Sequence, residues 1–231
     1  MEFKHIEAWL IDLDGTLVDT LGDFVAALQP VAQALGAPAA TAEQVRRLIG
    51  RGGAQLVRDL LQLWQQPESA FEPAWALYER HYREVNGKHA SVFEGVVPGL
   101  KALRAHGWRL VCVTNKPQAN AEALLAALGL RDDFEAVVGG GPNLRPKPEP
   151  DALLRACELL GLAPARVGMV GDSANDAEAA RAAGCGALVL LRHGYNHGEP
   201  IDSVPADWHL DRLDQGFNRD GTSSPCPAAV P

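Results

Sequence analysis

The sequence has no long apolar run, no cluster of basic residues and no closely spaced cysteines, and each absence excludes a class of protein. Its longest apolar run, near Ala187–Leu191, is far shorter than the roughly 20 apolar residues of a transmembrane helix. A formal net charge of −8 disfavours nucleic acid or an anionic membrane as partner. The four scattered cysteines indicate reduced thiols, and Asp12 and Asp14 interrupt any signal-peptide core. We therefore expect a cytoplasmic protein, either a monomer or a homodimer.

Strand-like and helix-like patterns alternate along most of the chain. Apolar runs at residues 6–11, 108–114, 134–138, 166–170 and 187–191 predict buried strands, and helical patterns separate the last four. This alternation predicts an α/β fold with a doubly wound parallel sheet. Residues 17–91 show helical periodicity alone and predict an all-helical domain inserted after the first strand. The catalytic core would then comprise residues 1–16 and 92–215, with a disordered Gly-, Ser- and Pro-rich tail at 216–231.

Polar side chains follow several of the predicted strands, at the point where each strand ends. Asp12 and Asp14 follow the first strand, Thr114 and Asn115 end the second, and Asp172 follows the fourth. The carboxyl ends of parallel strands share one edge of a sheet, where ligands bind. Lys147, in the loop after the third strand, reaches the same edge. The sequence thus predicts a crevice that contains three carboxylates, a hydroxyl and a lysine.

These residues also form a recognisable set of motifs. The segment Asp12-Leu13-Asp14-Gly15-Thr16 resembles the first motif of the haloacid dehalogenase (HAD) superfamily of phosphatases. Thr114, Lys147 and residues 171–176 (GDSAND) resemble the second, third and fourth motifs, in order. The resemblance covers residues 6 to about 210. It implies a Rossmann-like core, and it implies that the helical insertion is the family's small cap domain.

The resemblance implies a role for each residue in the hydrolysis of a small phosphate monoester. Asp12 would attack phosphorus and form an aspartyl-phosphate, and Asp14 would act as the acid and then the base. The Asp12 carboxylate, the Asp14 carbonyl and the Asp172 carboxylate would bind Mg²⁺, which prefers oxygen ligands. The remaining assigned residues would hold the phosphoryl oxygens (Thr114, Asn115 and Lys147) or orient Lys147 and the metal site (Asp176).

Each of these residues also has an ordinary structural interpretation. Asp172 can serve as the N-cap of the helix that follows it. Thr114 and Asn115 can form a simple turn at a strand end, and most single lysines such as Lys147 are solvated surface charges. Four motifs in the expected order on the expected elements favour the catalytic interpretation.

Finer features favour the phosphoglycolate phosphatases within the superfamily. Residues 48–53 (LIGRGG), 114–117 (TNKP) and 194–201 (GYNHGEPI) resemble stretches of those enzymes. Arg51 departs from the small polar residue expected there, and its guanidinium would either bind a substrate carboxylate or lie solvated at the surface. Two alternatives stay open, a sugar phosphatase or phosphomutase similar to β-phosphoglucomutase, and a receiver-type phospho-acceptor module.

Overall fold

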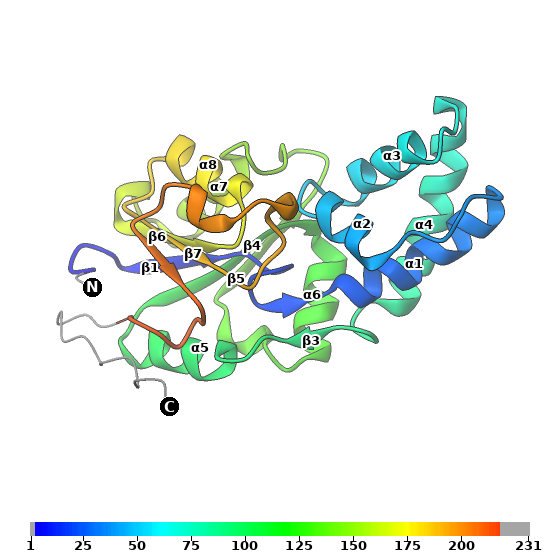
Figure 1. Ribbon diagram of the computed structural model, residues 1–231. Helices are drawn as coiled ribbons and strands as arrows, with labels where there is room; N and C mark the ends of the chain where they lie inside the picture. Colours follow the sequence, from blue (N-terminus) through cyan, green and yellow to red (C-terminus); the bar gives the residue numbers. More distant parts are fainter. Residues whose placement is uncertain (1–2, 218–231) are drawn as a thin grey trace, which may run out of the picture.

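The structure, a computed structural model, describes residues 3–217 and is built around one parallel sheet (Figure 1). The sheet has six strands in the order β5-β4-β1-β6-β7-β8, and every neighbouring pair is parallel. The order reverses on either side of β1, so the crevice at its carboxyl end is a topological switch point. The strands are β1 (Ala8–Ile11), β4 (Arg109–Pro117), β5 (Ala136–Gly140), β6 (Val167–Gly171), β7 (Ala187–Leu191) and β8 (Trp208–Leu210).

Helices cover both faces of this sheet (Figure 1). On one face, α5 (Val96–Ala105) and α6 (Gln118–Ala127) share an apolar core with side chains of β1, β4 and β7. On the other face, α7 (Asp151–Leu160) and α8 (Ala174–Ala183) pack on β6 and on the opposite side of β1. All five positions of β6 and of β7 are buried, as expected for strands covered on both sides. The α/β fold with a doubly wound parallel sheet is confirmed.

Four helices are inserted between the first strand and the rest of the core. They are α1 (Leu21–Ala34), α2 (Ala42–Leu48), α3 (Gly53–Leu63) and α4 (Phe71–Val85), and they enclose an apolar core of their own. The prediction that residues 17–91 are wholly helical is wrong at both ends. There β2 (Val18–Asp19) pairs antiparallel with β3 (Ser91–Val92). Two-residue strands are too short to leave a periodic pattern, and their pairing joins segments far apart in the sequence.

The predicted disordered tail begins too early. Phe217, inside the segment 216–231, is only 5% exposed and stacks on Phe3 at a ring-centroid distance of 5.8 Å. Its ring also meets the edges of Trp9 and Trp108 at 5.0 and 6.4 Å. This aromatic cluster ties the two ends of the described chain to the sheet. Residues 218–231 of the predicted tail lie outside the described residues.

Short 3₁₀ turns complete the described chain, at Glu68–Ala70, Arg131–Asp133, Pro164–Arg166, Asn196–Gly198 and Ile201–Ser203. Within residues 3–217, every helix is too short or too polar to cross a bilayer.

Candidate active site

The functional residues predicted at the sheet edge do meet there, around a buried ion-pair network. The Lys147 ammonium lies 2.6 Å from Asp12 Oδ1 and 2.7 Å from Asp176 Oδ1, and it also donates to the carbonyl oxygen of Val113. The Lys147 side chain is 3% exposed. Lys147 is therefore a buried, ion-paired residue of the site and not a solvated surface charge.

Burial and charge shift the protonation equilibria of this network in opposite directions. Desolvation raises the pKa of Asp12 to about 7, although the Lys147 charge opposes the shift. Burial alone would lower the pKa of Lys147, but the negative charges of Asp12 and Asp176 outweigh it, and the pKa is raised. Lys147 thus stays charged, while the Asp12 carboxylate sits in a site that needs further positive charge to stabilise its ionised form.

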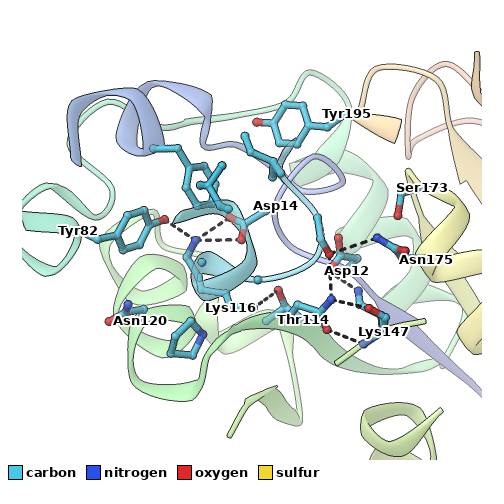
Figure 2. Close-up of a pocket in the computed structure, with 18 of the residues that line it drawn as sticks. Asp12, Asp14, Tyr82, Thr114, Lys116, Asn120, Lys147, Ser173, Asn175 and Tyr195 are labelled. Atoms are coloured by element: carbon cyan, nitrogen blue, oxygen red, sulfur yellow. Dashed lines mark hydrogen bonds and ion pairs between the residues drawn. The ribbon is translucent and has the colours of Figure 1, made fainter. Parts of the chain in front are cut away.

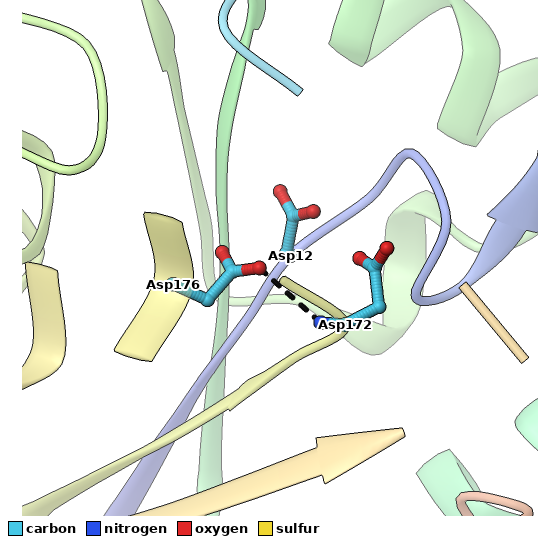
Figure 3. Close-up of side chains that lie close together, drawn as sticks. All are labelled: Asp12, Asp172 and Asp176. Carbon is cyan, nitrogen blue, oxygen red and sulfur yellow. Dashed lines mark hydrogen bonds between the residues drawn. The ribbon is translucent and has the colours of Figure 1, made fainter. Parts of the chain in front are cut away.

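Three buried carboxylates converge next to this lysine (Figure 3). One oxygen from each of Asp12, Asp172 and Asp176 lies within 4.8 Å of the others. Asp172 accepts hydrogen bonds from Thr16 Oγ1 at 2.6 Å and from the Tyr195 N–H at 2.8 Å. Within the described part of the chain, Asp172 forms no ion pair, and burial raises its pKa well above the usual range. One lysine among three acids leaves negative charge uncompensated.

These residues fit a divalent cation. The donor set is oxygen alone, which suits Mg²⁺. Glycines make room for the carboxylate of Asp172, because a Cβ on Gly194 would lie 2.2 Å from Asp172 Oδ2 and one on Gly15 would lie 2.4 Å away. Asp176 is less available as a ligand, since its Oδ2 accepts from Ser173 N, Ser173 Oγ and Asp172 N. Asp12 and Asp172 are therefore the carboxylates best placed for a metal.

The alternative in which Asp172 caps the following helix is wrong. Ser173 is the N-cap of α8, and the Asp176 carboxylate three residues later accepts from the Ser173 backbone N–H at 3.1 Å. This arrangement leaves the Asp172 side chain to face the site.

Asp14 points away from Asp12, toward Lys116 and Tyr82 (Figure 2). Its two carboxylate oxygens accept hydrogen bonds from Lys116 Nζ at 2.8 and 2.9 Å, and Oδ1 also accepts from Thr20 Oγ1 at 2.8 Å. Thr114 is 2% exposed, and its hydroxyl oxygen accepts from the Lys116 N–H at 3.2 Å. This hydroxyl can still donate its own proton to a ligand.

Known proteins are similar to this chain in both sequence and architecture. The family model of haloacid dehalogenase-like hydrolases matches residues 6–184. The chain belongs to this family. It is 45% identical over 208 residues to the plasmid-encoded phosphoglycolate phosphatase of Cupriavidus necator, with 90% of each chain covered. It is 38% identical over 226 residues to phosphoglycolate phosphatase of Escherichia coli K12, with 89% of each covered.

Comparison with a solved structure supports the same family at the level of the fold. The crystal structure of a predicted phosphoglycolate phosphatase from Haemophilus somnus 129PT matches with a TM-score of 0.84 and 31% sequence identity, covering 91% of this chain and 96% of that one. The chain is therefore a phosphatase of the haloacid dehalogenase-like family, and a small phosphate compound is its substrate.

The active-site cavity of this hydrolase lies between the core and the inserted helices. It holds about 240 Å³, and its lining includes Asp12, Asp14 and Lys147 from the core. The inserted helices contribute mainly apolar and aromatic side chains to the opposite wall, namely Phe24, Leu56, Trp75, Tyr78 and Tyr82. A small, largely enclosed cavity of this kind suits a small substrate.

Asn115 joins the loop between α2 and α3 to the core in this hydrolase. Its Nδ2 donates to the carbonyl oxygens of Gly50 at 2.9 Å and Lys147 at 3.0 Å, while Oδ1 accepts from the Lys147 N–H at 2.8 Å. The Asn115 side chain therefore positions the Lys147 loop and the Gly50 loop. Its own polar atoms are committed to these contacts and not free for a phosphoryl oxygen.

The structure does not bring Arg51 into the cavity. Its neighbours Gly50, Gly52 and Gly53 line the cavity, but the exposed Arg51 guanidinium pairs with Asp59 Oδ2 at 3.0 Å. The backbone around Arg51 approaches the core, so the side chain points to the opposite side, where α3 offers a carboxylate. In this structure Arg51 takes the surface position that the sequence left open as the alternative, and a substrate contact at Arg51 stays a prediction.

Lys116 is a buried cation of the cavity that the sequence did not single out. It is 4% exposed, and its ammonium contacts Asp14 and the hydroxyl of Tyr82, the latter at 2.5 Å. The ammonium also lies 5.1 Å from the centre of the Phe24 ring. Its place in the segment Thr114–Pro117, directly after a strand end, was the available signal.

Proposed function

We propose that this phosphatase depends on Mg²⁺ and hydrolyses 2-phosphoglycolate to glycolate and phosphate through an aspartyl-phosphate on Asp12. The single observation that carries the proposal is the buried group of Asp12, Lys147 and Asp172 at the switch point of the sheet, facing a cavity of about 240 Å³. The names of the relatives support 2-phosphoglycolate as the substrate.

Asp12 is the proposed nucleophile. Its Oδ1 accepts from Lys147, and among the described residues its Oδ2 accepts no hydrogen bond, so one oxygen is oriented while the other is available. Lys147 stays charged because of its two carboxylate neighbours, so it can neutralise charge that develops on the phosphoryl oxygens. The Thr114 hydroxyl and the backbone N–H of Asn115 complete the proposed phosphoryl contacts.

Asp14 is the proposed acid and base. It would protonate the alkoxide as glycolate leaves and then take a proton from the water that hydrolyses the aspartyl-phosphate. Thr20 holds one Asp14 oxygen at 2.8 Å, which fixes the orientation of the carboxylate. In hydrolysing the intermediate, the water restores Asp12 and releases inorganic phosphate.

The proposed Mg²⁺ site consists of the Asp12 carboxylate, the Asp14 carbonyl and the Asp172 carboxylate, with Asp176 orienting Lys147. The bound ion would supply Lewis-acid stabilisation of the phosphoryl charge. We further propose that residues 17–91 act as a cap over the core formed by residues 1–16 and 92–215, closing through contacts such as Asn115 to Gly50.

The experiment is a phosphate-release assay with Mg²⁺ on four substrates: 2-phosphoglycolate, ethyl phosphate, β-glucose 1-phosphate and p-nitrophenyl phosphate. We expect kcat/KM for 2-phosphoglycolate to exceed the values for the other alkyl phosphates by at least about tenfold. Preferential release of phosphate from β-glucose 1-phosphate would instead establish a sugar phosphatase, and its conversion to an isomeric sugar phosphate without phosphate release would establish a phosphomutase. A phosphoryl label that persists for minutes without turnover would establish a phospho-acceptor module.

A further inference from the structure

Two buried lysines line the cavity, and they lie at different ends of it (Figure 2). Lys147 is held by Asp12 and Asp176 at the sheet edge, where the phosphoryl group is proposed to bind. Lys116 lies toward the cap, where it contacts Asp14 and the hydroxyl of Tyr82 from α4. The second lysine has no role in the mechanism proposed above.

Lys116 is the buried cation that remains available for a substrate. Among the described residues that line the cavity, Lys116, Lys147 and Arg83 carry positive charge, and Arg83 is exposed. The side chain of Lys116 is 2% exposed. An ammonium at that depth needs an anionic or strongly polar acceptor, because water cannot solvate it.

Asp14 is shared between Lys116 and the proposed reaction. Both Asp14 oxygens accept from Lys116 Nζ, at 2.8 and 2.9 Å, and Oδ1 also accepts from Thr20 Oγ1. A substrate oxygen that binds to either Asp14 oxygen would therefore compete with Lys116 for it. The released ammonium then keeps the Tyr82 hydroxyl and the faces of the Phe24 and Tyr82 rings, which contribute no full negative charge.

We propose that Lys116, together with the Tyr82 hydroxyl, is the receptor for a second anionic group of the substrate, and that this group displaces Asp14 from Lys116. The inference rests on the proposed function and identifies that group as the carboxylate of 2-phosphoglycolate. It assigns the site to small phosphate monoesters that carry a carboxylate close to the ester oxygen. Binding of the substrate carboxylate to Lys116 thereby frees Asp14 to act as the acid. A monoester without the carboxylate leaves Asp14 paired with Lys116.

The test compares Lys116→Met with the wild type on 2-phosphoglycolate and on ethyl phosphate. Both substrates release an alkoxide and so need the same acid. On the proposal, Lys116→Met removes the carboxylate contact of 2-phosphoglycolate and also frees Asp14 for ethyl phosphate, so both effects lower the ratio of the two kcat/KM values. Since charged hydrogen bonds are lost only for the carboxylate substrate, we expect this ratio to fall at least about tenfold. Tyr82→Phe should lower the ratio in the same direction by about threefold. Lys88→Met, which removes an exposed lysine, should leave it unchanged.

Two additions keep the test decisive. Lys116→Arg should retain most of the ratio, which separates the need for charge from a purely structural role. Inhibition by 3-phosphonopropionate, which carries a carboxylate, and by propylphosphonate, which does not, reports binding without turnover. Lys116→Met should weaken binding of 3-phosphonopropionate at least about tenfold more than binding of propylphosphonate.

Three outcomes would overturn the proposal, and they are distinguishable. If the wild type shows no preference for 2-phosphoglycolate over ethyl phosphate, the proposed substrate is wrong and the receptor assignment falls with it. If the wild type prefers 2-phosphoglycolate but Lys116→Met and Tyr82→Phe keep that preference, the receptor assignment alone is wrong. If Arg51→Ala removes the preference instead, the receptor is in the cap loop.

Discussion

Replacing Lys147 by methionine should destabilise the protein more than any comparable loss of a surface lysine. The ammonium of Lys147 lies 2.6 Å from one buried carboxylate and 2.7 Å from another. The Asp12 and Asp176 side chains are 10% and 1% exposed, so water cannot take over the role of the lysine. Methionine preserves most of the side-chain volume, which isolates the loss of charge and hydrogen bonds.

Removing one partner of a buried ion pair costs about 3–5 kcal/mol of folding free energy, since an uncompensated charge stays behind. For a chain of this size, each kcal/mol corresponds to roughly 2–4 °C, so the midpoint of thermal unfolding should fall by on the order of 10 °C. The assay is urea unfolding at 25 °C, followed by tryptophan fluorescence in the presence of a chelator. Lys101→Met on the exposed face of α5 is the matched control and should change stability by less than about 0.5 kcal/mol.

A second substitution tests the cause of this loss. Asp176→Asn removes one of the two carboxylates, so combining it with Lys147→Met should recover part of the lost stability through a coupling of about 1 kcal/mol or more. A loss for Lys147→Met that equals the Lys101 control would refute the argument, because it would mean that the ion pairs contribute nothing net. Strictly additive effects in the double variant would show that the Asp176 carboxylate is not a source of the loss.

Asp12→Asn should abolish both turnover and phosphoryl labelling, and measurable turnover would require direct attack by water instead. Asp14→Asn should reduce turnover of 2-phosphoglycolate about 100-fold or more but that of p-nitrophenyl phosphate far less, because the phenolate leaves without a proton; equal losses would contradict its role as acid. Exhaustive chelation should remove activity and added Mg²⁺ should restore it, and full activity without metal would exclude the proposed site. Phe217→Ala should cost about 3 kcal/mol in urea unfolding, whereas no change would mean that its aromatic cluster is dispensable.

Local patterns were sufficient to predict most of the core. Residues 187–191 form a strand over the predicted range, because a strand covered on both faces reads as a continuous apolar run. Asp12 and Asp172 were found because each stands within two residues of the end of such a run, and parallel strands bring those ends together. The order of the elements and the positions of the carboxylates can thus be predicted from the sequence pattern alone.

Other features depend on partners that are distant in the sequence. The strands at Val18–Asp19 and Trp208–Leu210 are short, and pairing with other segments creates them. Phe217 follows Gly216 in a stretch of turn-forming residues, and only the approach of Phe3 and Trp9 makes it part of the core. No local pattern records such a contact, because its energy comes from burial against another part of the chain.

Tertiary contacts also determine which cations line the cavity. Arg51, Lys116 and Lys147 are all cations in or next to loops near the site, and the sequence gives no direction to their side chains. Asp59 on α3 holds Arg51 outside the cavity, whereas Asp14 and Tyr82 draw Lys116 into it. The ends of the strands set the positions of the residues at the sheet edge, so the sequence alone was enough to predict the chemistry there. The cap side of the cavity depends on which charged partners the fold brings within about 3 Å of each lysine or arginine, and only the folded chain settles that.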